Sequence, residues 1–249
     1  MRIFWTLLRR ELSSFFISLT GYVIIAAVTL IVGSSFVMLI RNMGTDPFSM
    51  PVTELFFNSL MYWLLLILIG PVITMRLFAQ EKASGTFETL MTTPVGDLEV
   101  VAAKFTAAVF FYMVAWLPSL AGLVIIQHFT NQPRPDWGMV GGLYLGIFLS
   151  GCLFLSIGCL ASSLTRSQMV AAMVSLAVGV VLFILAYMAQ VIPATATAEA
   201  DVLFYFNLFK QMEDFTRGVV DTRSVIFYLT ATFWFLFLTL RVVESRRWK

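Results

Sequence analysis

Long stretches of the sequence carry no charged residue, and short polar segments separate them. The charge-free stretches cover residues 12–40, 55–75, 105–127, 137–165, 167–198 and 224–240. A helix needs about 20 apolar residues to cross the hydrocarbon core of a bilayer. These stretches are continuously apolar and do not alternate with period two, which favours helices over a β-barrel. The pattern therefore predicts an all-α membrane protein with six transmembrane helices.

The last of these stretches is the shortest but is rich in Phe and Leu, and we expect Tyr228 and Trp234 to act as interfacial anchors for it. Composition supports a membrane protein, because 59% of the residues are hydrophobic and 12% are charged, against about 25% charged residues in soluble domains. The net charge of +2 and the scattered basic residues argue against nucleic-acid binding. Cys152 and Cys159 both lie in one apolar stretch and cannot frame a disulfide-rich domain.

The positions of Lys and Arg predict the orientation. Both termini and the loops 76–104 and 165–167 fall on one side, which carries eleven of the 16 basic residues. The positive-inside rule therefore places this side in the cytoplasm.

Residues 1–18 predict an interfacial helix on the inner leaflet. Apolar residues recur at helical spacing at Phe4, Leu8, Leu12, Phe15 and Leu19. The opposite face carries Arg2, Thr6, Arg9 and Ser13. A cytoplasmic extension of the first span is the alternative. Arg9 and Arg10 before an apolar run also resemble a signal peptide, but the run is longer than the 7–15 residues typical of one.

The middle of each predicted span lacks ionisable residues, which usually mark ion and proton pathways. An ion-driven transporter is therefore disfavoured. An intramembrane enzyme is disfavoured too, because no paired Asp, Ser-Lys pair or His-rich metal site falls within the spans. The single histidine, His128, is expected as a polar residue at the end of the third span, and we predict no catalytic or metal-binding residue.

Small residues in the fourth and fifth spans predict close helix packing. They repeat every four residues at Gly142, Gly146 and Ser150, and at Ala171, Ser175 and Gly179. Packing within one subunit is favoured slightly over packing between two. Pro71 and Pro118 are expected to kink the second and third spans.

One sizeable loop, residues 193–223, is predicted on the extracytoplasmic side. Phe204, Leu208, Met212 and Phe215 share one helical face there. We expect an amphipathic helix on or in the outer leaflet that caps the bundle, with gating of an exit path as the alternative.

The charged segment from Arg76 to Lys104 is the main cytoplasmic surface. Gly85 is expected to end the helix of the second span, and Pro94 to end a short helix over residues 86–93. Asp97 is expected to cap the helix of the third span. The short helix combines apolar and charged residues that we expect to be exposed, which is typical of a docking element. The candidate docking residues are Glu81, Lys82, Gly85, Thr86, Phe87, Glu88, Leu90, Met91 and Pro94. A helix resting on lipid headgroups is the alternative.

The string QEKASGTFETLMTTPVGDLEVVAAK resembles the segment between the second and third spans of ABC-2 type transporter permeases. RRELSSFFISLTGYVIIA near the start, and FTRGVVDTRSVIFYL and LRVVESRRWK near the end, resemble the branch with the gliding-motility permease GldF and the nitrous-oxide-reductase maturation permease NosY. The resemblance extends over residues 1–249 as a single transmembrane domain in a bacterial inner membrane. It implies that residues 86–93 are a coupling helix that meets an ATPase.

The resemblance also implies the partners. These are nucleotide-binding subunits that hold ATP and Mg²⁺, a second permease copy or a homologous permease, and membrane lipid. An extracytoplasmic accessory protein is a further candidate partner. The chain has no G-x-x-x-x-G-K-[ST] sequence, so we expect no cofactor in it and assign hydrolysis to the partner. The expected function is ATP-driven transport, as an exporter. The alternative is a non-transporting scaffold of an ATPase-driven assembly or maturation complex.

Overall fold

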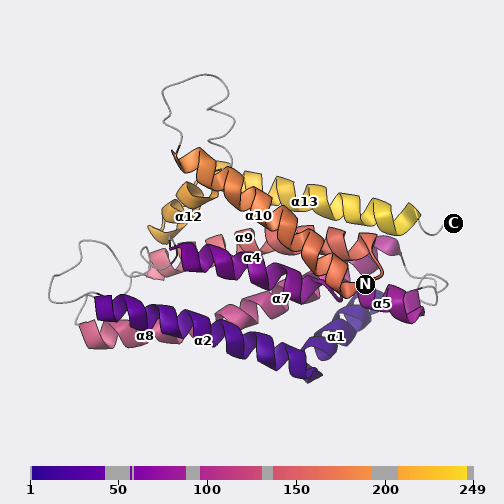
Figure 1. Ribbon diagram of the computed structural model, residues 1–249, viewed down its shortest axis with the longest axis horizontal. Helices are drawn as coiled ribbons and strands as arrows, with labels where there is room; N and C mark the ends of the chain where they lie inside the picture. Colours follow the sequence, from indigo (N-terminus) through magenta and orange to yellow (C-terminus); the bar gives the residue numbers. More distant parts are fainter. Residues whose placement is uncertain are drawn as a thin grey trace, which may run out of the picture.

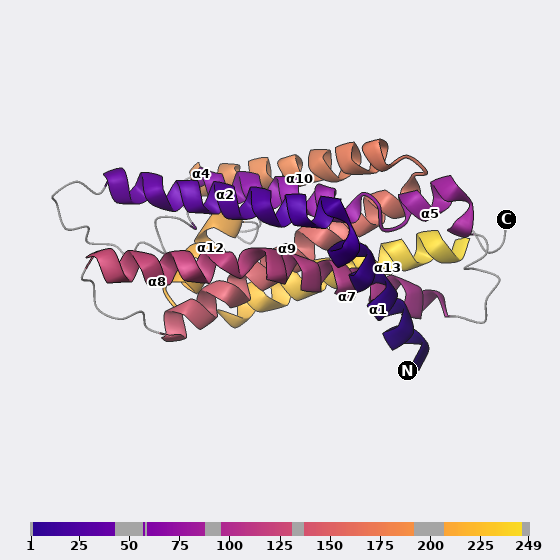
Figure 2. The same ribbon diagram turned by 90° about the horizontal axis from the view of Figure 1, so that it is seen from below.

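The computed structural model describes residues 2–42, 57, 59–87, 96–130, 137–191 and 207–245. These residues are almost entirely helical and contain no strand. Their long helices run roughly parallel in one elongated bundle, with the first and last helical residues and α5 at the same end (Figures 1 and 2). The helices are α1 (Arg2–Ile17), α2 (Leu19–Asn42), α4 (Leu60–Thr74), α5 (Ala79–Ser84), α7 (Asp97–Trp116), α8 (Pro118–Thr130), α9 (Trp137–Leu164), α10 (Gln168–Val191), α12 (Leu208–Thr216) and α13 (Thr222–Ser245).

Six segments in the described ranges are long and apolar enough to cross a membrane, as the sequence predicts. They are Leu19–Met38, Leu60–Ser84, Asp97–Val124, Trp137–Leu164, Gln168–Val191 and Thr222–Ser245. Prolines mark two of them. Pro118 divides the third span into α7 and α8, and Pro71 lies in the last turn of α4, just before the chain enters the turn at 75–78. His128 lies in α8.

Helix α9 forms the centre of the bundle and packs against α4, α7, α10, α12 and α13. Its small residues explain why so many helices can approach it. A Cβ atom on Gly151 would collide with the ring of Tyr112 on α7, and one on Gly158 with Thr74 on α4. A Cβ atom on Gly146 would lie 3.0 Å from Sδ of Met212 on α12. Glycine at these positions therefore sets the distances between α9 and three of its neighbours.

Helix α1 is separate from α2, which starts after a bend at Ser18 (Figure 2). The apolar face of α1 packs on protein. Leu8 and Phe15 are buried, and the Phe15 ring stacks on Phe111 of α7 at a centroid distance of 4.9 Å. Leu19 does not extend this face, because it starts α2 and is 80% exposed.

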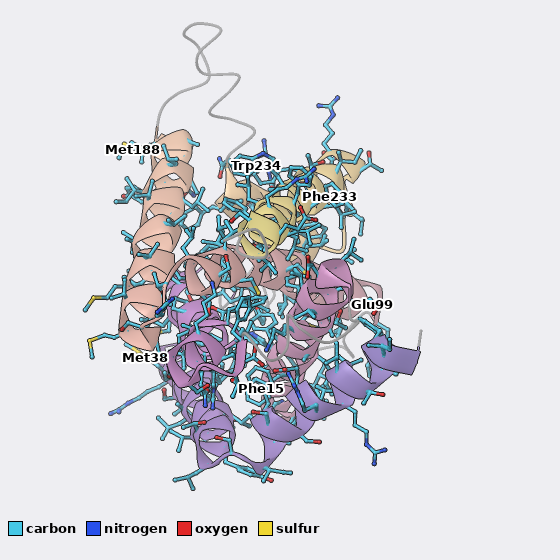
Figure 3. The ribbon with its side chains drawn as sticks, turned by 90° about the vertical axis from the view of Figure 1, so that its right-hand side faces the viewer. Phe15, Met38, Glu99, Met188, Phe233 and Trp234 are labelled. Atoms are coloured by element: carbon cyan, nitrogen blue, oxygen red, sulfur yellow. The ribbon has the colours of Figure 1, made fainter. Side chains whose placement is uncertain are left out.

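Three further sequence expectations are wrong in detail. Tyr228 is buried, and Trp234 (labelled in Figure 3) is the thirteenth of the 24 residues of α13, so neither marks an end of that span. Gly96, not Asp97, is the N-cap of α7, and Asp97 is the first residue of the helix. The apolar face of α12 does not lie in lipid: Met212 and Phe215 are buried against α9, because the same pattern suits either surroundings. Phe204 falls outside the described residues.

Candidate functional site

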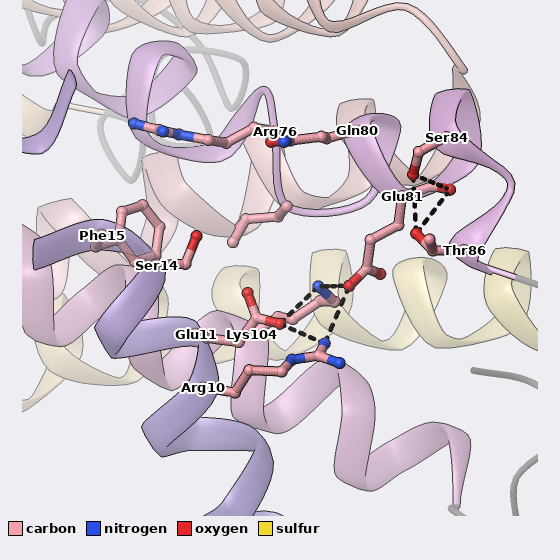
Figure 4. A pocket seen from close by; sticks show the side chains of 11 residues that line it. Arg10, Glu11, Ser14, Phe15, Arg76, Gln80, Glu81, Ser84, Thr86 and Lys104 are labelled. Carbon is pink, nitrogen blue, oxygen red and sulfur yellow. Dashed lines mark hydrogen bonds and ion pairs between the residues drawn. The ribbon is translucent and has the colours of Figure 1, made fainter. Parts of the chain in front are cut away.

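The charged segment that follows α4 lines a pocket at the end of the bundle that holds the first residues of α1. The pocket has a volume of about 660 Å³ and lies between α1, α5 and the first half of α7. Arg10 and Glu11 come from α1, Glu81 from α5 and Lys104 from α7 (Figure 4). These four side chains form one connected group of ion pairs, named here the α1–α5–α7 ion network.

Lys104 is the centre of the α1–α5–α7 ion network. Its Nζ lies 3.0 Å from Oε1 of Glu11 and 2.9 Å from Oε1 of Glu81. Nη2 of Arg10 contacts the same two oxygens, at 2.8 Å from Glu11 and 3.0 Å from Glu81. Two cations and two carboxylates thus alternate across three helices (Figure 4). Contacts between formally charged groups are stronger than neutral hydrogen bonds, so the network joins α1, α5 and α7 firmly.

Burial makes this network sensitive to the loss of any member. The Lys104 side chain is only 3% exposed, and its ammonium also lies 5.5 Å from the centre of the Phe78 ring. A buried ammonium is costly unless carboxylates compensate it. Burial alone would raise the pKa of Glu11, but the charges of Lys104 and Arg10 outweigh burial and hold that pKa below its ordinary value. Burial alone would lower the pKa of Arg10, and its two carboxylate partners raise it overall.

Arg76, at the start of the segment, attaches it to the corner between α1 and α2. Nη1 of Arg76 donates to Oγ of Ser18 at 3.3 Å, and the guanidinium lies 5.6 Å from the centre of the Phe15 ring. Ser18 is the bend itself, and Phe15 lies in the last turn of α1. A displacement of the segment would therefore pull on this bend as well as on the ion network.

The end of α9 holds the turn between α4 and α5. Oγ of Ser162 accepts hydrogen bonds from the backbone N–H groups of Phe78 and Ala79, at 3.0 and 3.1 Å, and donates to the carbonyl of Met75. The first N–H groups of a helix have no partner within the helix, so this hydroxyl replaces a missing cap. Nζ of Lys82 donates to the carbonyl of Ser163. The helix α5 is thereby tied to α9 at both of its ends.

Beyond α5 the structure changes one expectation about the docking residues. Gly85 has a φ of 74°, a left-handed conformation that ends α5 at Ser84. Phe87, expected to be exposed, is buried at 6% exposure, with Nζ of Lys82 over its ring at 5.1 Å. Lys82 is buried too, so these two side chains belong to the bundle and do not form an exposed docking surface. Thr86 is exposed, and the Thr86 and Ser84 hydroxyls share a hydrogen bond of 2.8 Å.

Glu81 also differs from its expected role, because its Oε1 faces Lys104 and Arg10 of the same chain. The other docking candidates, Glu88, Leu90, Met91 and Pro94, lie outside the described residues. Sequence reasoning missed Arg10, Glu11 and Lys104 as members of the same group. Glu11 and Lys104 each stand directly before a long apolar run, and this position is the one sequence feature that marks them. It does not identify which charged residue pairs with which.

The two rows of small residues lie where α9 and α10 meet their neighbours. A Cβ atom on Gly142 would come within 2.8 Å of the Phe215 carbonyl, and the Ser150 hydroxyl is 3.0 Å from that of Tyr62. On α10, Ala171, Ser175 and Gly179 are buried, and a Cβ atom on Gly179 would contact Phe154 of α9 at 3.4 Å.

The described side chains of the site offer ion pairing between helices. Among the residues whose positions are described, no group of three His, Cys, Asp or Glu side chains could hold a metal ion. The two cations and two carboxylates of the ion network balance in charge, which suits a joint between helices, although Oε2 of Glu81 is buried without a hydrogen-bond partner among the described residues.

Comparison with known proteins identifies the family. The model of a family described as "ABC-2 family transporter protein" matches residues 34–244, which is most of the chain. No curated protein matches the chain.

Proposed function

The chain belongs to the ABC-2 transporter family, and on this premise we propose that a separate ATPase drives it through residues 86–93. Membership makes the chain a membrane-spanning permease subunit of an ABC transporter. The family also implies association with an ABC ATPase subunit. Our proposal adds the place of contact, the energy source and the path by which movement enters the bundle.

One observation carries the proposal. The segment from Arg76 to Gly85, which leads directly into residues 86–93, is fastened to four other parts of the bundle. Glu81 joins it to α1 and α7, Ser162 and Ser163 join it to α9, and Arg76 joins it to the bend at Ser18. A loop that served only to connect two spans would not require such contacts.

These contacts make α5 a lever in the proposed cycle. When the ATPase closes on ATP it displaces residues 86–93, and α5 moves with them because Gly85 and Phe87 are held next to it. The ion network then passes the movement to α1 and α7, while the Ser162 contacts pass it to α9. ATP shifts the equilibrium between two arrangements only if the ATPase binds one of them more tightly.

The remaining parts of the proposal rest on charge distribution and resemblance. The excess of Lys and Arg supports a cytoplasmic position for both termini and the segment 76–104, in a bacterial inner membrane. The resemblance to ABC-2 permeases supports export as the direction and a second permease as partner, and it supports the branch with the gliding-motility and nitrous-oxide-reductase maturation permeases. The spans without charged residues at their centres favour an apolar or amphipathic cargo.

Loss of the contact surface tests the proposal. We would replace Leu90 and Met91 by Ala and Glu88 by Lys, and leave the buried Phe87 intact so that the bundle stays folded. The ATPase encoded beside the permease, or isolated with it from native membranes, should co-purify at least tenfold less with this variant. The matched control is Val219→Ala with Val220→Ala, an exposed apolar pair at the opposite end of the bundle. Equal co-purification of the variant, the control and the wild type would refute the assignment.

Transport itself is tested with proteoliposomes that contain the permease and its ATPase. ATP-dependent movement of an amphipathic fluorescent probe across the membrane supports a transporter. Hydrolysis that depends on the permease but moves no probe would instead support a scaffold for an ATPase-driven assembly.

A further inference from the structure

A second pocket lies far from the ion network, on the side of the bundle formed by α9, α10 and α13. Both α10 and α13 pack on α9, and the pocket is a groove between them with a volume of about 660 Å³. Leu153 of α9 and Leu182 of α10 line it, together with residues along one face of α13. Only two of its lining residues are polar, Thr230 and Arg223. The groove is therefore an apolar surface with a single cation.

The position of that cation is informative. Arg223 is the second residue of α13, so it lies at the end of the span, while Trp234 lines the groove halfway along the helix. Trp234 follows Arg223 by eleven positions, which is about 16 Å at a rise of 1.5 Å per residue. One leaflet of a bilayer contributes about 15 Å of hydrocarbon, half of the ~30 Å core. The groove thus extends from the headgroup level to about the middle of the membrane.

Arg223 is exposed, and it has no ion-pair partner within the described parts of the chain. The nearest acidic residue in sequence, Asp221, accepts the backbone N–H of Arg223 at 2.9 Å. On the same end of the bundle, the guanidinium of Arg217 pairs with Glu213. Arg223 therefore offers an unneutralised charge beside an apolar groove, whereas its basic neighbour is neutralised within the chain.

The lining of the groove matches the chemistry of one occupant. Its side chains are apolar apart from Thr230 and Arg223, and Arg223 lies at the end of α13. A single extended hydrocarbon chain would lie along the apolar part, and a phosphate at its end would meet Arg223, because a guanidinium pairs well with phosphate oxygens.

We propose that the groove between α10 and α13 binds one acyl chain of an anionic phospholipid, whose phosphate is held by Arg223. This site takes its lipid from the leaflet on the α12 side of the bundle. It does not depend on the partner ATPase or on the docking role of residues 86–93.

Photochemical labelling in nanodiscs tests the proposal. The probes are phosphatidylglycerol and phosphatidylcholine that carry the same diazirine-bearing acyl chain, and mass spectrometry measures the label on residues 223–235. One Arg near a charged lipid surface contributes about 1 kcal/mol, so we expect phosphatidylglycerol to label about fivefold more than phosphatidylcholine. Arg223→Gln should make the two lipids equal, whereas Arg223→Lys should keep the preference.

A second variant tests the groove itself and not only its charge. Ala231→Trp fills the groove and should reduce labelling by both lipids. The matched control, Ala27→Trp on the exposed side of α2, should leave labelling unchanged. Thermal unfolding shows whether each variant folds. If Ala231→Trp does not fold, the comparison of the two lipids on Arg223→Gln tests the proposal without it.

Two results would overturn the proposal. Equal labelling by the two lipids in the wild type, or a preference that survives Arg223→Gln, would mean that the groove holds ordinary surrounding lipid. A disulfide between two copies of an Ile226→Cys variant, formed in membranes without added ATPase, would mean that the groove is an interface between subunits.

Discussion

Lys104 of α7 and Glu81 of α5 form an ion pair of 2.9 Å in which the lysine side chain is 3% exposed. The two residues belong to consecutive spans, and the chain between them contains the whole segment 86–93. Their contact therefore closes a loop around the proposed docking segment and fixes both of its ends to one point. Glu11 of α1 joins the same ammonium at 3.0 Å, so a third helix meets at this point.

Removal of the ammonium should destabilise the fold strongly. Lys104→Met leaves Glu11 and Glu81 close together with only the half-exposed Arg10 to compensate them. Loss of one partner from a buried pair costs about 3–5 kcal/mol, and we expect about 3 kcal/mol because both carboxylates retain some exposure. Unfolding in mixed detergent and SDS micelles measures the change.

The control is the exposed pair between Arg241 and Glu244, at 3.0 Å. Arg241→Gln should change the free energy of unfolding by less than about 1 kcal/mol. If the Lys104 and Arg241 variants lose similar stability, the ion network is not the joint described above.

The network should also make stability depend on acid pH. The lowered pKa of Glu11 means that its carboxylate favours the folded state above the ordinary pKa of 4.5, and that this contribution is lost as pH falls toward the lower folded-state pKa. The unfolding midpoint of the wild type should therefore drop as pH falls below 4.5. Glu11→Gln removes this group, so its midpoint should start lower and fall less steeply over the same range. Parallel curves for the two proteins would contradict the assignment.

The hydroxyl of Ser162 provides a test of the joint between α9 and α5. Ser162→Ala leaves the N–H groups of Phe78 and Ala79 without their acceptor, and each buried unsatisfied group costs about 1–3 kcal/mol. We expect lower stability, and also hydrolysis by the bound ATPase that no longer responds to the permease.

Ser163→Ala is the matched control. Among the described residues, the Ser163 hydroxyl bonds only to the carbonyl of Leu160 on its own helix, and the backbone carbonyl that accepts from Lys82 stays. This variant should keep both stability and coupling. A Ser163 variant as impaired as the Ser162 variant would argue against a specific joint.

Glycine on α9 should be irreplaceable only where another helix is close. Gly158→Ala places a methyl group against Thr74 of α4, and overpacking of this kind costs about 1–3 kcal/mol. Gly141→Ala, with no atom within 4 Å of its new Cβ, should be neutral or slightly stabilising because alanine favours helices. Thermal unfolding in the same detergent compares the two, and equal stability would contradict the packing.

Much of the fold was predictable from the sequence because one physical rule decides it. A continuous apolar run of about 20 residues has few alternatives to a membrane helix, so the six spans follow from the pattern. The end of α5 before Gly85 and the division of the third span at Pro118 follow from local backbone chemistry in the same way. These features depend on neighbouring residues alone.

The contacts of the site could not be predicted in this way. Glu11 and Lys104 are 93 residues apart, and nothing local identifies them as partners. Met212 and Phe215 illustrate a second difficulty, because an apolar helical face packs equally well on lipid or on protein. Phe87 illustrates a third: its burial depends on Lys82, which extends its charge toward α9 and covers the ring.

Cross-linking of residue 90 to the ATPase in intact membranes tests the central claim most directly. Leu90→Cys would be placed in a chain whose buried Cys152 and Cys159 are replaced by Ala, and Val219→Cys, at the opposite end, serves as the control. With a short bifunctional thiol–amine reagent, we predict one product with the combined mass of permease and ATPase from position 90 and none from position 219. No product from position 90, or equal yields from both positions, would contradict the account.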